Sequence, residues 1–388
     1  MAIEFSPLPL PDSAEASSFS SFGRQVKGFD PTNFTQEEFA TIENALYKHD
    51  LLLFRSVNLS PEKQYALNKA FDPICDDFGH GNNEIDKNKK SILHPDLKTI
   101  PRVPQVQLIG NGTVYNHEGI TEDTLKHPSH TTFHKTRVSP EDEAKGATRF
   151  FRWHIDAALY DRRTPSVPKG PKQTCRYDDG TDDELPVPLG TTAFVSGKTM
   201  FEILPPELKS LAVRSKVKYA PLPYVWMAPA HAVSTGLGLE SEGLEIPYNK
   251  LPSWEETKRM VLPVLWKNPV TGELHFQVHP CGVAELLVDP ISEGGKKEGA
   301  LYPDGAHLTD LKEIRELLYK IQRPGIAPKL VYPHDWSERD LVLFHNRGVL
   351  HSVVGAFNKD QVRAFHQCNL AASDDPVGPT VDDAKKWS

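Results

Sequence analysis

A histidine and an aspartate separated by one residue are the strongest candidates for chemistry in this chain. They lie in the segment Phe151-Arg-Trp-His154-Ile-Asp156. Side chains alternate along an extended strand, so the imidazole of His154 and the carboxylate of Asp156 point to the same side. The two groups are good metal ligands. The pair alone is weak evidence for a metal, because histidine and aspartate often only form hydrogen bonds.

A third ligand is available in the C-terminal part of the chain. His351 lies in the segment Asn346-Arg-Gly-Val-Leu-His351-Ser. Two histidines and one carboxylate form the facial arrangement that suits iron(II) in oxygen-activating enzymes, and this arrangement leaves other positions on the metal open. We therefore predict a mononuclear iron(II) site formed by His154, Asp156 and His351.

Polar and apolar residues alternate in Gln361–Leu370, the next stretch expected to be a strand. Arg363, Gln367 and Asn369 share one face, and the opposite face is apolar apart from His366. A strand on the surface would turn the polar face to water, and the sequence leaves that alternative open. If the face lines a cavity, it presents a guanidinium and two amides to a ligand.

The segment Pro104-Gln105-Val-Gln107-Leu repeats this pattern, with two amides on one face. Buried amides that lack partners cost free energy. Two such faces in one cavity therefore predict a polar ligand. The sequence does not decide which of Gln105 and Gln107 contacts it.

Helix and strand signals alternate along the chain and favour an α+β protein. Two helix starts are clearly marked, by a capping box at Thr35–Glu38 and by Ser60 followed by Pro61. We expect helices over 35–48, 60–71, 205–213 and 309–321 and strands over 51–54, 340–345 and 361–370, with strand signals dominating from residue 103 onward.

The content of 33 prolines indicates many short elements joined by loops. We predict a double-stranded β-helix (jelly-roll, cupin-like) core with flanking and inserted helices. Residues 1–22 are rich in serine and proline and are expected to be loose. Residues 23–388 are predicted to form a single domain, in which residues 161–187 form a solvated loop.

Composition limits the expected partners and compartment. The formal net charge of −8 argues against a nucleic-acid partner. The apolar runs are too short to span a bilayer, and the first residues do not resemble a signal peptide. The cysteines lie far apart in the sequence, so no disulfide framework is expected. We expect a cytosolic protein with a small-molecule substrate and no membrane partner, and homo-oligomerisation is left open.

The order of the candidate residues resembles the taurine-dioxygenase superfamily of iron(II)/2-oxoglutarate enzymes. The resemblance extends from about Gly28 to Gly378. Within that superfamily the chain more closely resembles the fungal xanthine dioxygenases, which hydroxylate xanthine to uric acid. The supporting segments are Leu-Lys126-His-Pro, Glu141-Asp142, Arg-Trp-His154-Ile-Asp156-Ala-Ala-Leu-Tyr, His345-Asn-Arg-Gly and Gln367-Cys-Asn369-Leu-Ala-Ala.

The resemblance implies iron(II) as the cofactor, 2-oxoglutarate and O2 as co-substrates, and succinate and CO2 as co-products. Arg363 would bind the distal carboxylate of 2-oxoglutarate, since a planar guanidinium matches a carboxylate bidentately. Thr192 would add a hydroxyl to that carboxylate. No catalytic side chain is implied beyond the metal ligands. The implied substrate-binding residues are Lys126, Gln105, Gln107, Glu141, Asp142, Gln367 and Asn369.

The chain departs from the family at one place. Family members have an apolar strand soon after the His-x-Asp segment, but Tyr160–Gly170 contains no apolar run. We therefore expect a core strand to be missing between Tyr160 and Gly190, which would leave backbone groups unpaired. A catalytically impaired paralogue thus stays open. So does the same chemistry on another small polar substrate, such as a sulfonate, which would also suit Lys126.

Three other motifs are expected to be unremarkable. Residues 234–240 lack the glycine spacing and the lysine of a phosphate-binding loop and are expected to be a flexible loop. Tyr224-Val-Trp226 is expected to be part of the core. Two further clusters lack a complete zinc ligand set at the usual spacings and are expected to contain only hydrogen-bonded or solvated histidines; they are His127, His130 and His134, and His275, His279 and Cys281.

Overall fold

The computed structural model describes residues 2–75, 98–126, 130–156, 160–166, 172–240, 242–354, 357, 361–369 and 372–387. The helices are α1 Gln36–His49, α2 Pro61–Lys69, α3 His130–Phe133, α4 Pro140–Ala144, α5 Gly197–Glu202, α6 Pro206–Val213, α7 Pro223–Trp226, α8 Leu311–Gln322 and α9 Val381–Trp387. None of the helices in these residues has the length and apolarity needed to cross a bilayer.

The described residues form twenty-one strands. They are β1 Glu4–Pro7, β2 Arg24–Lys27, β3 Leu51–Phe54, β4 Lys98–Ile100, β5 Val103–His117, β6 Ile120–Leu125, β7 Ala147–Thr148, β8 Tyr160–Ser166, β9 Gln173–Arg176, β10 Glu184–Val187 and β11 Thr192–Ser196. They continue with β12 Ser215–Tyr219, β13 Val261–Pro263, β14 Leu265–Lys267, β15 Leu274–Phe276, β16 Val283–Val288, β17 Ala306–Leu308, β18 Tyr332–His334, β19 Leu341–His345, β20 Val349–Val353 and β21 Arg363–Cys368.

The predicted helix starts are confirmed. The Thr35 hydroxyl accepts a hydrogen bond from the Glu38 amide and the Glu38 carboxylate reaches back to Thr35, which is a complete capping box. Ser60 caps α2, with Pro61 in its first turn. The helices predicted at 205–213 and 309–321 and the strands predicted at 51–54, 340–345 and 361–370 are also present.

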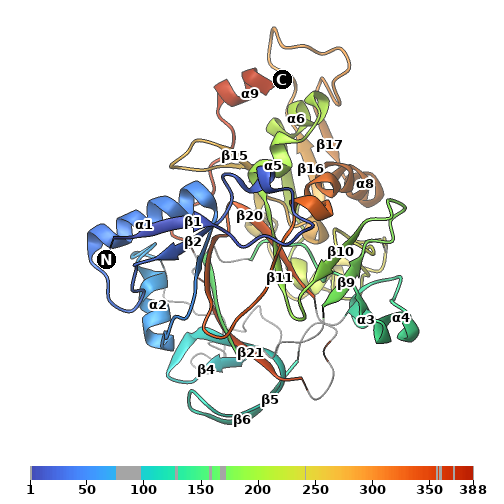
Figure 1. The fold of residues 1–388 in the computed structure, drawn as a ribbon. Coiled ribbons are helices and arrows are strands. Elements are labelled where there is room, and N and C mark those ends of the chain that lie inside the picture. The colour runs from blue at the N-terminus through green and yellow to red at the C-terminus, as the bar shows by residue number, and fades with distance from the viewer. Residues whose placement is uncertain are drawn as a thin grey trace.

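Among the described residues, the largest sheet has nine strands in the order β1-β2-β3-β19-β8-β21-β5-β4, with β6 paired to β5. A second sheet has the order β18-β11-β20. Figure 1 shows β11 and β20 in the middle of the molecule, with α1 and α2 to one side and α8 to the other.

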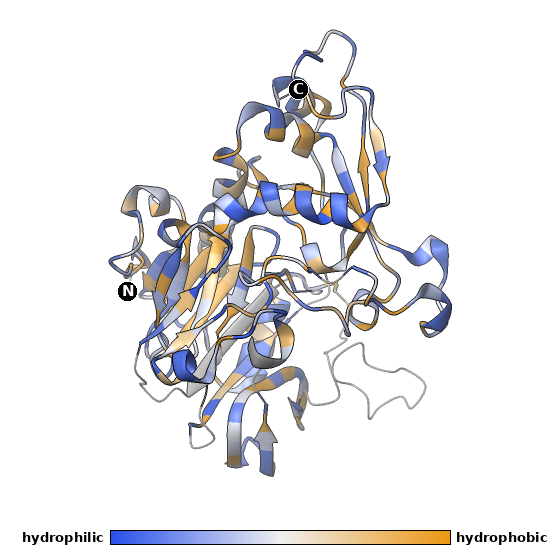
Figure 2. Ribbon diagram, turned by 90° about the vertical axis from the view of Figure 1, so that its right-hand side faces the viewer, coloured by the Kyte–Doolittle hydropathy of each residue, from blue (hydrophilic) through white to orange (hydrophobic). Residues whose placement is uncertain are grey.

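The two faces of the large sheet have different partners. Leu52 and Leu343 lie on its outer face and pack with Ile42 of α1 and Leu67 of α2. The alternate residues of β3 and β19 lie on its inner face and pack with Phe194 of β11 and with side chains of β18 and β20. Figure 2 shows apolar residues concentrated in the central strands, whereas the helices carry hydrophilic stretches. The small sheet therefore covers the inner face, and helices cover the outer face.

This architecture confirms a mixed α+β fold, but the prediction of a jelly roll is only partly met. The described strands form an extended large sheet facing a smaller one, and they do not by themselves close into a double-stranded β-helix. The four cysteines are all buried and free, in agreement with the absence of a disulfide framework.

The prediction of a missing core strand is wrong. Strand β8 runs through Tyr160–Ser166 and pairs antiparallel with both β19 and β21, in the middle of the large sheet. Residues 173–176 and 184–187 also form strands, so 161–187 is not simply a loop. Strand formation depends on the neighbours available for pairing more than on local composition. A polar, proline-containing segment between two paired strands was therefore mistaken for loop.

The N-terminal segment is also more ordered than expected. Residues 4–7 form β1, which pairs with β2, and Leu8, Phe19 and Phe22 are buried against the inner-face cluster. Serine and proline composition indicated a loose segment, but these three apolar side chains anchor it. The prediction of a single domain over 23–388 stays a prediction.

Candidate metal centre

The backbone brings the first and third predicted metal ligands together. The amide of His154 donates to the carbonyl of His351 and the amide of His351 donates to the carbonyl of His154, both at 3.0 Å. The two imidazole centroids are 4.2 Å apart. An isolated antiparallel bridge between distant segments therefore places both histidines side by side.

The donor atoms of His154, Asp156 and His351 converge, with every pair within 4.8 Å. The Nε2 atom of His154 lies 3.6 Å from one Asp156 oxygen, and the Nε2 atom of His351 lies 3.5 Å from the other. Among the described residues, no other group of histidine, cysteine and acidic side chains converges in this way. Of the two histidine clusters considered from the sequence, His275, His279 and Cys281 do not converge in this way, whereas His127 and the side chain of His130 lie outside the described residues.

The donor set fits an iron(II) ion. The Nδ1 atom of His154 lies 2.8 Å from the carbonyl of Arg152, so Nδ1 carries the proton and Nε2 keeps its lone pair for a metal. This tautomer is assigned from the hydrogen bond. Two imidazoles and one carboxylate on one side leave the remaining positions of the ion for other ligands.

Asn346 holds the aspartate ligand in place, a role that the sequence did not predict. Its side-chain oxygen accepts from the Asp156 amide at 3.0 Å, and its side-chain nitrogen donates to the Asp156 carbonyl at 2.8 Å. Asn346 is fully buried and directly follows β19. The only sequence signal for this role was its place in the polar turn between β19 and β20.

Gln367 also acts on the aspartate ligand. Its side-chain nitrogen donates to Asp156 Oδ2 at 3.1 Å. The sequence placed Gln367 among the substrate-binding residues, whereas this contact orients the carboxylate through one of its oxygens. Its neighbour Asn369 is also buried and lies near it, with Asn369 Oδ1 at 3.5 Å from the Gln367 nitrogen.

Strand register places the polar face of β21 toward the interior. Gln367 pairs through β8 with Val342 of β19, whose side chain lies in the inner-face cluster. Arg363 is fully buried and Gln367 is 6% exposed, so the alternative of a surface strand facing water is excluded. Ala364 and Cys368, on the other side of β21, pack in a separate apolar cluster.

Arg363 lies in β21, close to the turn at Gly190 that precedes β11. Its guanidinium carbon is 4.3 Å from the Phe365 ring centroid. Gly190, with φ +68°, lies so close that a Cβ atom there would be 3.0 Å from Arg363 Cδ. Thr192 follows two residues later, and its hydroxyl oxygen accepts from the Trp336 indole at 3.3 Å. The structure therefore brings Thr192 and Arg363 to adjacent segments.

The two glutamines of β5 face the same side as Gln367. Gln107 is 3% exposed and lies directly opposite Gln367 in the β5–β21 ladder. Gln105 lies two residues away on the same strand and so shares that face. Both glutamines therefore face the same side, and they differ only in their position along β5.

The remaining predicted substrate residues lie on other elements. Lys126 is exposed and directly follows β6. Glu141 and Asp142 lie in α4, where Asp142 accepts from the Ser139 hydroxyl and forms an ion pair with Arg176 at 3.3 Å. The substrate role of these three residues stays a prediction.

Residues 234–240 brace the segment that carries two metal ligands. The Trp153 amide donates to the Gly236 carbonyl at 3.0 Å. Gly236 has φ +76°, and a Cβ atom there would lie 1.8 Å from the Phe151 carbonyl oxygen. Thr235 is 1% exposed. The prediction of a loop is confirmed by the turns and bends at 234–238, its flexibility stays a prediction, and Gly236 permits a close backbone contact.

The stretch 224–226, which was predicted to be part of the core, is only partly buried. Trp226 is buried in an apolar cluster as expected, whereas Tyr224 is 40% exposed. The Tyr224 ring lies 5.7 Å from that of His279, which in turn lies 6.1 Å from that of His154. Burial holds the pKa of His279 well below its usual range, and the neighbouring His154 and Arg152 lower it further.

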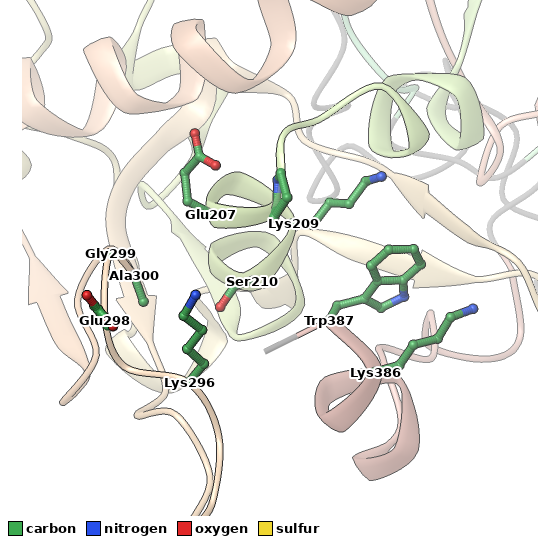
Figure 3. Close-up of a pocket in the computed structure, with 10 residues that line it drawn as sticks. Glu207, Lys209, Ser210, Lys296, Glu298, Gly299, Ala300, Lys386 and Trp387 are labelled. Atoms are coloured by element: carbon green, nitrogen blue, oxygen red, sulfur yellow. The ribbon is translucent and has the colours of Figure 1, made fainter.

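A surface hollow of about 430 Å³ lies elsewhere, between α6, residues 296–300 and α9 (Figure 3). Its lining includes Lys209, Lys296, Lys386 and Trp387. None of the metal ligands or predicted substrate residues lines it. It is therefore separate from the candidate centre.

Comparison with known proteins places the chain in a family. The profile described as "Taurine catabolism dioxygenase TauD, TfdA family" matches residues 5–369. The chain is 50% identical over 394 residues to the alpha-ketoglutarate-dependent xanthine dioxygenase xan-1 of Neurospora crassa, covering 98% of this chain and 89% of the relative. It is 48% identical over 391 residues to the corresponding xan1 protein of Schizosaccharomyces pombe, covering 98% and 91%.

The fold comparison agrees with the sequence comparison. The crystal structure of a taurine dioxygenase from Burkholderia xenovorans superposes with a TM-score of 0.55 at 15% identity and covers 99% of this chain and 98% of that one. At this identity the likeness concerns the fold alone. Together with the profile match and the convergent His154, Asp156 and His351, it shows that the chain belongs to the taurine catabolism dioxygenase TauD, TfdA family of iron(II)- and 2-oxoglutarate-dependent enzymes.

Proposed function

We propose that this protein hydroxylates xanthine to uric acid and couples the reaction to conversion of 2-oxoglutarate and O2 into succinate and CO2. The observation that carries the proposal is the arrangement between the two sheets, where a His-His-Asp group faces a strand bearing a buried arginine and amides. Relatives that are about half identical over nearly the whole chain are xanthine dioxygenases. Iron(II) and 2-oxoglutarate, when bound, supply the oxidising chemistry.

The residues of this chain then have distinct tasks. His154, Asp156 and His351 would hold the metal through two imidazole nitrogens and a carboxylate oxygen. Asn346 fixes the backbone of Asp156, and Gln367 orients its carboxylate by donating to Oδ2. These contacts hold the donor atoms in position before the metal binds, which favours a defined coordination geometry.

Arg363 and Thr192 are proposed to bind the distal carboxylate of 2-oxoglutarate. The guanidinium is fully buried, where a charge-assisted contact with a carboxylate is strong. The Thr192 oxygen accepts from the Trp336 indole, and a hydroxyl group is both an acceptor and a donor. Gly190 leaves room for the arginine side chain.

Substrate recognition is assigned to the polar groups that face the interior. Gln105, Gln107 and Asn369 present amides, which can pair with both the N–H and the carbonyl groups of xanthine. Lys126, Glu141 and Asp142 belong to the same proposal by resemblance. A site built from such groups rejects analogues that lack matching hydrogen bonds.

We further propose that the large sheet and β18-β11-β20 are the two halves of a double-stranded β-helix within one domain spanning 23–388. A cytosolic location also stays a proposal, supported by the four free cysteines. Oligomeric state is left to measurement.

A substrate panel tests the proposed function. Iron-loaded protein is supplied with 2-oxoglutarate and, in parallel, with xanthine, hypoxanthine and taurine, and succinate is quantified. We expect xanthine to stimulate succinate release well above the uncoupled rate. Stimulation by taurine alone would replace xanthine with a sulfonate, and binding of xanthine without turnover would indicate an impaired paralogue.

A further inference from the structure

His279 is a buried histidine that neither the metal site nor the predicted substrate residues include. It lies just before the short turn Pro280–Gly282 that leads into β16. The residue is 6% exposed, and within the described chain neither of its ring nitrogens has a hydrogen-bond partner. Burying polar atoms without partners costs free energy, so an unpaired buried imidazole needs an explanation.

The position of His279 relates it to the metal centre. Its ring centroid lies 6.1 Å from that of His154. It is not a fourth ligand, because it does not belong to the group of convergent donor atoms. The His279 ring also lies edge-on to the Tyr224 ring, with 5.7 Å between the centroids, and Tyr224 is 40% exposed. His279 thus connects a metal ligand to a residue at the protein surface.

A cation lies close to this histidine. Arg152 packs its guanidinium over the rings of Phe133 and Phe151, at 4.5 and 5.1 Å, and donates to the Met227 sulfur at 3.7 Å. Within the described residues, the Nε atom of Arg152 is buried without a hydrogen-bond partner. Arg152 and His154 share one side of an extended segment. Positive charge and unpaired nitrogens therefore occur on the same side of the metal ligand.

These features fit one class of ligand. A planar heterocycle with alternating N–H and carbonyl groups offers an acceptor to a protonated imidazole nitrogen or a donor to an unprotonated one. A weakly acidic N–H group on that ring would be favoured by a nearby guanidinium. The amide of Gln367 is occupied with Asp156, so recognition of such a ring needs further polar groups.

We propose that His279 contacts the substrate and forms a hydrogen bond with the polar edge of a planar heterocycle beside His154. This inference rests on the proposed hydroxylation of xanthine and adds a residue that determines its specificity. Arg152 supports the contact through its charge. His279 is a substrate-binding residue in this account and transfers no proton.

The test compares three variants with the wild type. His279→Phe keeps a planar ring and removes both nitrogens. His279→Gln restores one donor and one acceptor without the ring. Cys281→Ala, in the same buried turn, is the matched control for disturbed packing. Each protein is loaded with nickel(II), a redox-inert substitute, and with 2-oxoglutarate, and the dissociation constant of xanthine is measured by calorimetry.

We expect His279→Phe to weaken xanthine binding about ten- to a hundredfold, as expected when one or two buried hydrogen bonds are lost. Binding of nickel and of 2-oxoglutarate should be unchanged. His279→Gln should recover part of the loss, and Cys281→Ala should bind xanthine like the wild type. With iron and oxygen, the effect should appear in the KM for xanthine more than in kcat.

The outcomes separate this inference from the proposed function. Equal xanthine affinity of the wild type and His279→Phe would overturn the role of His279 and leave the proposed function standing. Equal losses in His279→Phe and Cys281→Ala would also overturn it, since the effect would then be one of packing. A wild type that binds no xanthine under these conditions would overturn the proposed function, and the inference with it.

Discussion

Two groups of histidine and aspartate each include a histidine of the same three-stranded sheet, yet they differ in how their atoms are satisfied. On β18, the Nδ1 atom of His334 pairs with the Tyr332 hydroxyl at 2.8 Å, and its Nε2 atom lies 3.1 Å from Asp340. Asp340 also accepts from the Ser337 amide and pairs with Arg55. This group is a continuous chain of hydrogen bonds.

The group around His351 of β20, which forms the candidate metal site with His154 and Asp156, has the same residue types but another geometry. The Nε2 atoms of His154 and His351 lie 3.6 and 3.5 Å from the Asp156 oxygens, longer than ordinary hydrogen bonds. The donor atoms point at a common centre, and the contacts that hold them come from Asn346 and Gln367. Residue type alone therefore does not separate a structural group from a metal site, but the convergence of the donor atoms does.

Removal of a metal ligand is expected to have the largest effect. Loss of a side chain that contacts a metal ligand weakens metal binding about tenfold to a hundredfold. His154→Ala removes a ligand itself, so its metal affinity should fall by more than this, and turnover should become undetectable. Unfolding by urea should change little. Iron content and succinate release measure the first effect, and His307→Ala, which replaces an exposed histidine, is the control. If His154→Ala retained iron-dependent turnover, His154 would not be a required metal ligand. The two histidine–aspartate groups would then no longer differ in function.

The β18 group should show the opposite response. His334→Ala removes the partner of a fully buried aspartate and leaves a cavity, so the free energy of unfolding should fall by about 3 kcal/mol. Iron binding per folded molecule should persist at low temperature. Urea unfolding followed by circular dichroism measures the loss. A change below about 1 kcal/mol would contradict a structural role for this group.

Gln367 sharpens the comparison because two roles predict different results. If it orients Asp156, Gln367→Leu should weaken metal binding about tenfold to a hundredfold even without substrate. If it only binds substrate, metal affinity should be unchanged and the KM for xanthine should rise. Titration with iron(II) under anaerobic conditions decides between them. Asn369→Leu is the comparison variant, since it removes a buried amide two residues away on the same face of the chain.

A third buried group, around Asp50, predicts a smaller, pH-dependent effect. Burial raises the pKa of Asp50 to about 6, and His275 partly offsets the rise. The folded state therefore binds more protons than the unfolded state between about pH 4 and 6, so the stability contributed by Asp50 falls as pH rises through this window. Asp50→Asn, which also tolerates the local φ of +59°, removes this dependence.

The stability of Asp50→Asn relative to the wild type should thus increase with pH from about 4 to 6 and level off above it, by at most about 3 kcal/mol. His345 is present in both proteins, so its own titration largely cancels. Urea unfolding at several pH values gives the difference. A difference that does not vary with pH would show that Asp50 is not the buried acid in question.

The shared side of His154 and Asp156 and the polar face of β21 were predictable because each is encoded in short spacings. Strand periodicity placed Arg363 and Gln367 on one face, and His-x-Asp placed two ligands on one side. Capping residues such as Thr35 and Ser60 marked the helix starts equally well. These signals depend only on residues within a few positions of one another.

The errors concern features that depend on distant partners. β8 forms because β19 and β21 leave a place for a strand, which local composition does not reveal. Asn346 and Gln367 hold Asp156 across more than a hundred residues of sequence, and no local pattern marks such contacts. The close contact between Gly236 and the Phe151 carbonyl also joins distant segments, and the glycine alone does not reveal it, because glycine occurs in both close backbone contacts and open turns.

The central claim is tested most directly by the stoichiometry of products. Wild-type protein and Asp156→Ala are each supplied with iron(II), 2-oxoglutarate and xanthine, and uric acid and succinate are quantified over several turnovers. The account predicts about one uric acid for each xanthine-dependent succinate in the wild type, and neither product above background in folded Asp156→Ala. Xanthine-independent succinate release by folded, iron-loaded wild type, with no uric acid formed, would contradict it.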